Sequence, residues 1–117
     1  MEDLKKDAED NKIMGILAYL GILVLVPILA AKDSPFARFH ANQGLVLLIA
    51  AIVAGFVIGI FNTILVFVSL GLAALLGGLL SAAVGIGSLV FMILGIINAA
   101  KGEMKELPII GKYTILK

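Results

Sequence analysis

The sequence has no cysteine and no tryptophan, and it has a single histidine among 117 residues. Without cysteine, disulfide bonds, thiolate nucleophiles and cysteine-ligated metals are excluded. One histidine without acidic or histidine partners nearby makes a poor metal site. Paired carboxylates, nucleophile constellations and phosphate-binding loops are also lacking, and the formal net charge of +1 gives no reason to expect nucleic acid. We therefore expect a protein that is not an enzyme and needs no cofactor.

Charge is missing altogether from one long stretch, Gly44–Ala100, which contains no Asp, Glu, Lys, Arg or His. A bilayer crossing needs about 20 apolar residues, and this stretch would measure about 85 Å as one helix. It must therefore fold back within a membrane. The overall hydrophobic content of 62% fits no ordinary soluble surface. These features predict an all-α, multi-pass integral membrane protein. Intramembrane carboxylates, which a proton-coupled transporter would need, are missing.

The charge distribution divides the chain into three regions. Residues 1–12 form a charged tail, residues 13–100 a helical transmembrane domain, and residues 101–117 a basic tail. The first transmembrane helix is predicted at Ile13–Ala31, because this uncharged segment would be about 28 Å long as a helix. Pro27 is expected to kink it.

The number of crossings after Gly44 depends on where the apolar stretch breaks. A break in the glycine-rich segment Ser69–Gly78 allows two crossings and three transmembrane helices in total. A further break at Asn62–Thr63 allows four. The positive-inside rule does not decide between three and four helices, because the three-helix model leaves the cations of residues 1–12 outside the cytoplasm. We favour three helices, with four as the alternative.

The polar segment Lys32–Gln43, KDSPFARFHANQ, is predicted to form an interfacial amphipathic collar before the second helix. Ser34 is expected to cap that helix and Pro35 to occupy its first position. The collar would turn its aromatic side chains toward lipid and its basic side chain toward phosphate. Its polar members either set the depth of the helix or recognise a lipid or partner. The candidate interfacial residues are Phe36, Arg38, Phe39, His40, Asn42 and Gln43.

Three small residues, Ala51, Gly55 and Gly59, recur every four positions and predict a helix-packing groove. Packing within the chain is the favoured interpretation, against a surface formed by Gly85, Gly87 and Gly95. Contact with a second copy or another membrane protein is the alternative. Asn62 is the best candidate for an interhelical hydrogen bond.

The segments AKDSPFARFHANQGL and GIINAAKGEMKELPIIGKYTILK resemble a family of small prokaryotic membrane proteins of unknown function. That family is similar to the small Tic subunit of the chloroplast inner-envelope translocon and to some magnetosome membrane proteins. The most specific residues are Ser34, Pro35, Phe36, His40 and Gln43. The resemblance implies three or four membrane helices in a prokaryotic cell membrane, and its plant branch implies protein translocation.

Two functions follow as expectations. The first is a protein that works through helix contacts in the lipid bilayer, as a homo-oligomer or as a subunit of a larger assembly. The alternative is a channel or protein-translocation component, with the polar side chains of residues 38–43 lining its mouth.

Overall fold

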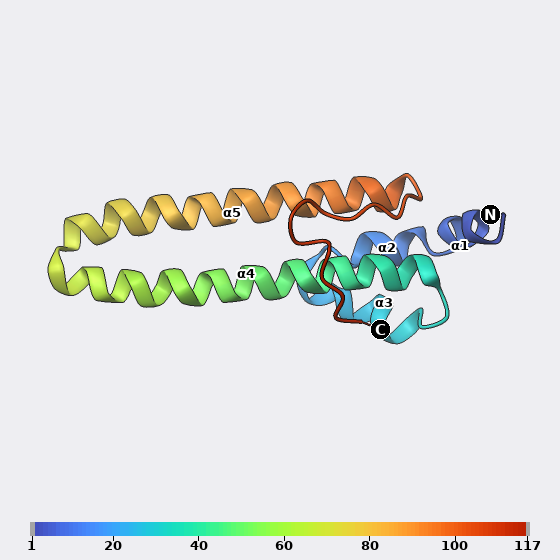
Figure 1. Cartoon of the computed structure of the whole chain (residues 1–117), viewed down its shortest axis with the longest axis horizontal. Coiled ribbons are helices and arrows are strands. Elements are labelled where there is room, and N and C mark those ends of the chain that lie inside the picture. The colour runs from blue at the N-terminus through green and yellow to red at the C-terminus, as the bar shows by residue number, and fades with distance from the viewer. Residues whose placement is uncertain (1, 117) are drawn as a thin grey trace.

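The chain folds into a long helical hairpin with several short helices packed at one end, as a computed structural model describes for residues 2–116 (Figure 1). Met1 and Lys117, the outermost residues of the two predicted tails, lie outside the described residues. The described elements are α-helical or 3-10 helical, which confirms the all-α class. In chain order they are α1 (Glu2–Asp10), α2 (Lys12–Leu17), the 3-10 helix η1 (Gly21–Val24), α3 (Leu25–Ala30), α4 (Pro35–Val68) and α5 (Leu70–Ala100).

Helices α4 and α5 form the hairpin. They have 34 and 31 residues, and within the described part of the chain they are the two helices long and apolar enough to cross a membrane. The chain turns between them at Ser69, whose backbone is extended and whose side chain accepts a hydrogen bond from the backbone N–H of Leu72. The predicted glycine-rich break is therefore confirmed at its first residue. Asn62–Thr63 lies inside α4, so the second predicted break is wrong.

The segment Ile13–Ala31 is not the single helix that its composition predicts. Helix α2 ends at Leu17, and the chain reverses at Gly21, the first residue of η1, whose φ is 62°. From there η1 and α3 run back alongside α2. A positive φ is accessible to glycine without steric strain, so Gly21 permits the reversal. Pro27 is buried within α3 and does not mark the bend. In place of the predicted first transmembrane helix, residues 13–31 form a short, doubled-back hairpin.

Helix α4 begins at Pro35, as predicted, because two side chains satisfy its first N–H groups. The Ser34 hydroxyl accepts from the backbone N–H of Ala37 at 3.0 Å. Asp7, on α1, accepts from the backbone N–H of Phe36 at 2.9 Å and from the Ser34 hydroxyl at 2.6 Å. A carboxylate at a helix N-terminus also interacts favourably with the helix dipole. Asp7 therefore fastens α1 to α4.

Replacing Asp7 with alanine should detach α1 and destabilise the protein by about 1–2 kcal/mol, because the Phe36 N–H loses its side-chain acceptor. Thermal unfolding of the purified protein in detergent measures this. Asp3→Ala is the matched control, since Asp3 lies on α1 with an exposed side chain. Equal unfolding temperatures for the two variants would show that the cap does not matter.

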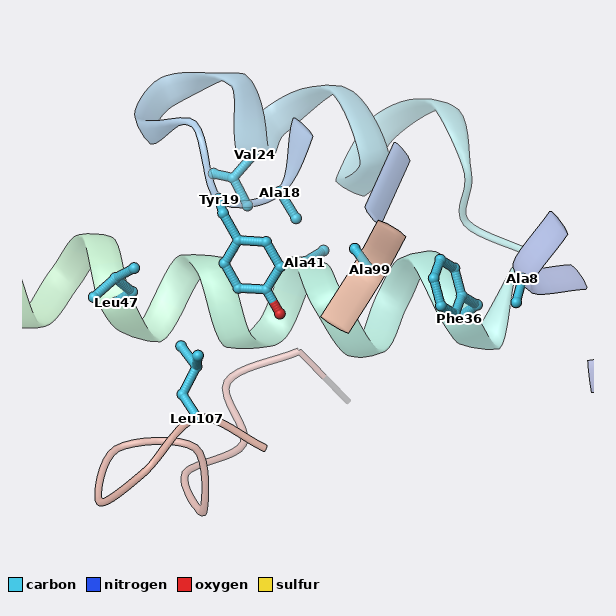
Figure 2. Packing of buried hydrophobic residues seen from close by; sticks show 9 residues of the cluster. All are labelled: Ala8, Ala18, Tyr19, Val24, Phe36, Ala41, Leu47, Ala99 and Leu107. Atoms are coloured by element: carbon cyan, nitrogen blue, oxygen red, sulfur yellow. The ribbon is translucent and has the colours of Figure 1, made fainter. Parts of the chain in front are cut away.

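The buried core lies at the end of the hairpin where the short helices gather. We call residues 2–48 and 91–116 the head, and residues 49–90 the shaft. Side chains from the short helices, both long helices and the C-terminal segment meet in the head. Figure 2 shows them: Ala8, Ala18, Tyr19, Val24, Phe36, Ala41, Leu47, Ala99 and Leu107. The shaft instead exposes large apolar side chains, such as Phe56, Ile60 and Leu79. Such a surface suits lipid rather than water.

Candidate functional site

The polar cluster predicted as an interfacial collar lies on the first turns of α4, inside the head. Phe36, His40 and Gln43 are at most 1% exposed, and Asn42 is 8% exposed. Phe36 faces the protein core rather than lipid, because α1, α2 and the end of α5 close over this part of α4 (Figure 2). Arg38 and Phe39 are half-buried. The segment is therefore a packed part of the head and not an exposed collar.

His40 has a partner at each ring nitrogen. Its Nε2 lies 2.7 Å from the backbone oxygen of Glu103, and its Nδ1 lies 2.6 Å from the Tyr19 hydroxyl. A carbonyl oxygen only accepts, so Nε2 carries a hydrogen, and in the neutral ring Nδ1 accepts from the hydroxyl. The rings of Phe36, Phe39 and Tyr19 surround the imidazole edge-on, with centroids 4.6–5.5 Å away. His40 therefore joins three distant segments of the chain.

Gln43 and Asn42 hold the non-helical segment that follows α5, which we call the strap (residues 103–116). Gln43 accepts from the backbone N–H of Leu107 at 2.8 Å and donates to the oxygen of Gly111 at 2.9 Å. Asn42 donates to the backbone oxygen of Tyr113 at 2.9 Å. It also accepts from the backbone N–H groups of Ile115 and Leu116. Asn42 thus bonds to Tyr113 and Ile115 as a peptide group of a neighbouring strand would. Gln43 instead joins the two ends of a turn, in which the Gly111 N–H donates to the Leu107 oxygen.

The strap, which the sequence predicts as part of a basic tail, is packed against the head. Leu107 is buried in the core, and a side chain at Gly111 would collide with the Leu107 backbone. On the exposed side, Nζ of Lys105 lies 2.9 Å from Oε2 of Glu103. The hydrogen bond between them lowers the pKa of the Glu103 carboxyl. Such exposed ion pairs contribute little to stability.

The predicted packing glycines do not pack against their own chain. A Cβ built on Gly55 or on Gly59 would meet no atom within 4 Å. Both line an open groove of about 600 Å³ on α4, together with Ile52, Phe56, Ile60, Thr63 and Ile64. Ala51 lies apart, in a second cleft between α4, α5 and the turn at Gly21. The intrachain interpretation therefore fails at Gly55 and Gly59, whereas Ala51 does face α5 across the second cleft.

Of the three glycines expected to face the groove, Gly85 lines the second cleft together with Ala51, and the other two lie elsewhere. Gly87 has open space around it, whereas Gly95 lies against the ring of Tyr19. The close approach of α4 to α5 occurs at Gly77, where any side chain would collide with that of Asn62. Asn62 is thus an interhelical packing residue, although its buried Oδ1 has no hydrogen-bond partner among the described residues.

The fold and these contacts describe a small helical protein that has two helices long and apolar enough to cross a membrane and whose polar side chains fasten its own segments together. The model of the magnetosome magnetite crystal formation protein family matches residues 10–114, and this chain belongs to that family. Its relatives include two proteins of Paramagnetospirillum magneticum. Magnetosome protein MamF is 32% identical over 104 residues, covering 89% of this chain and 82% of the relative. Magnetosome protein MmsF is 31% identical over 98 residues, covering 84% and 79%.

A further relative is the magnetosome protein MamF of Magnetospirillum gryphiswaldense, which is 41% identical over 75 residues, or 61% of this chain and 68% of the relative. No solved structure matches this chain. These relatives confirm the magnetosome part of the predicted resemblance and the location in a membrane of a prokaryotic cell. The relation to the Tic subunit is not supported by them.

Proposed function

We propose that this protein takes part in magnetite crystal formation as a non-catalytic membrane protein that associates with a second copy of itself through α4. The family description supports the process. The observation that carries the self-association is the groove at Gly55 and Gly59, which the chain's own α5 leaves uncovered. Association through this groove would bring heads together in the membrane without any reactive group.

The groove has the properties of a contact between membrane helices. Lipid tails are as apolar as leucine, so helices associate in a bilayer through close packing rather than through the hydrophobic effect. Glycines spaced by four residues let two backbones approach closely. The one hydroxyl in the groove, that of Thr63, already donates to the oxygen of Gly59 at 2.8 Å. A partner helix would therefore leave no polar group without a hydrogen bond.

The non-catalytic part of the proposal is supported by the state of His40, since both of its nitrogens are engaged and its ring is enclosed. A channel or protein-translocation component has less support. The side chains expected to line its mouth, such as Asn42 and Gln43, bond to the strap instead.

Leucine at Gly55 or Gly59 should weaken self-association at least about tenfold, which corresponds to about 1.4 kcal/mol, because the added side chain fills the groove. Energy transfer between labelled copies in liposomes, measured over a dilution series in lipid, gives the association constant. The fold should survive, since a side chain at either position has open space in the single chain.

Gly78→Leu provides the matched control. Gly78 lies on α5 and is equally open, but it does not line the α4 groove. The proposal predicts normal association for this variant. If all three leucine variants associate like the unchanged protein, or if the unchanged protein is monomeric at every dilution, self-association through α4 is wrong.

A further inference from the structure

We propose that α4 and α5 alone cross the membrane, that residues 13–31 enter and leave it on one side, and that the polar part of the head faces the cytoplasm. The opposite membrane surface would then receive only the uncharged turn around Ser69. This topology does not depend on the proposed self-association, since one chain suffices for it. It differs from the crossing counts that hydrophobic length predicts.

Three polar segments that lie far apart in the sequence are bonded to one another. They are residues 2–12, 32–43 and 101–116. Asp7 of the first bonds to Ser34 and to the Phe36 backbone of the second. His40 and Gln43 of the second bond to the backbone of the third at Glu103, Leu107 and Gly111. Segments joined by direct hydrogen bonds cannot lie on opposite sides of a bilayer.

Between the first two polar segments, the chain reverses beside α4. Helices α2 and α3 lie beside each other and against α4, and they meet the same end of the long hairpin (Figure 1). The reversal occurs at residues 18–21, where Ala18 and Tyr19 are almost fully buried against other helices. Irregular backbone at membrane depth is tolerated when it is buried in protein. Residues 13–31 can therefore dip into lipid and return without crossing.

The positions of the cations indicate the orientation, because a bias of lysine and arginine sets the orientation of a membrane protein. No lysine or arginine occurs between Arg38 and Lys101. Every described cation thus belongs to one of the three joined segments. They are Lys5, Lys6 and Lys12 in the first, Lys32 and Arg38 in the second, and Lys101, Lys105 and Lys112 in the third. The positive-inside rule then places all three segments in the cytoplasm.

The carboxylates of the described residues also lie in the three polar segments, whereas the turn at Ser69 exposes apolar side chains such as Phe67 and Leu70. Recognition of metal ions or of a charged surface by carboxylates of this chain is therefore restricted to the cytoplasmic side. At the opposite surface the chain offers a serine hydroxyl between apolar side chains.

Single cysteines test the topology, because the chain has none of its own. The variants Asp3→Cys, Asp33→Cys and Lys112→Cys report on the three polar segments, and Ser69→Cys reports on the turn; all four side chains are exposed. Each is treated with a membrane-impermeant maleimide in intact spheroplasts and in inverted membrane vesicles. Labelling after detergent addition gives the full signal at each position.

The expected result is near-complete labelling at positions 3, 33 and 112 in inverted vesicles and background labelling in spheroplasts, with the reverse at position 69. Labelling of positions 3 and 33 from opposite sides would show that residues 13–31 cross, and would overturn the proposal. So would labelling of all three polar segments from outside, or a position 69 that reacts only in detergent. Because energy transfer reports association separately, failure of the topology is distinguishable from failure of the proposed function.

Discussion

Replacing Gly44 with leucine is expected to disrupt the head and to lower the free energy of unfolding by about 3 kcal/mol or more. A Cβ at this position would overlap the carbonyl oxygen and carbon of Ala18. These are backbone atoms, so the clash cannot be relieved by rotation of a side chain. The turn after α2 would have to move away from α4, and the contacts of Ala18 and Tyr19 in the core would be lost with it.

The measurement compares thermal unfolding of the purified variant in detergent with the rate of trypsin cleavage in the strap, where Lys105 and Lys112 supply cleavage sites. Gly78→Leu is the control, because it makes the same chemical change on a helix face with open space. Faster cleavage and a lower unfolding temperature are expected for Gly44→Leu only. If the two variants behave alike, the close contact between α4 and Ala18 does not hold the head together.

The parts of the fold that the sequence predicts are those decided by local chemistry. Ser34 followed by Pro35 marks the start of α4, because a hydroxyl acceptor and a proline suit those positions in almost any helix. The uncharged stretch after Gly44 predicts long apolar helices, because the absence of charge is a property of composition alone. Neither conclusion needs knowledge of which segments touch.

The doubled-back hairpin could not be predicted in this way. An uncharged segment such as Ile13–Ala31 has the same composition whether it crosses a bilayer or reverses within one leaflet. Its reversal depends on the tertiary contact of Ala18 with Gly44, two positions with no special local signal. Gly21 was the one local clue, since a glycine in the middle of an apolar segment can adopt a positive φ.

The sequence identifies the polar residues of the site but not their role. His40, Asn42 and Gln43 bond mainly to the backbone of the strap, and a backbone partner has no sequence signature. Two amide side chains directly before a long apolar stretch were a usable clue, because buried amides require partners. Similarly, the spacing of Gly55 and Gly59 predicts a groove without showing which surface will fill it.

The second large effect is expected at His40. His40→Ala should lower the free energy of unfolding by about 3–5 kcal/mol, since it removes a fully buried ring and leaves a cavity among aromatic side chains. It also leaves the Tyr19 hydroxyl and the Glu103 carbonyl without their observed partner. Tyr19→Phe should cost less, about 1–3 kcal/mol, because only the acceptor nitrogen of His40 becomes unsatisfied. Unfolding titrations of each variant in mixed micelles give these differences.

A double-mutant cycle distinguishes this hydrogen bond from general packing. If the Tyr19 hydroxyl stabilises the head by bonding to His40, then Tyr19→Phe should have little effect once His40 is alanine, because the hydroxyl has already lost its partner. The two single effects would then sum to more than the double effect. Tyr113→Phe is the control for loss of a phenolic hydroxyl, since Tyr113 is 56% exposed, and it should change stability by less than about 0.5 kcal/mol. Strictly additive effects at Tyr19 and His40 would mean that the hydrogen bond contributes nothing to the free energy of unfolding. The enclosed imidazole would then stabilise the head by packing alone.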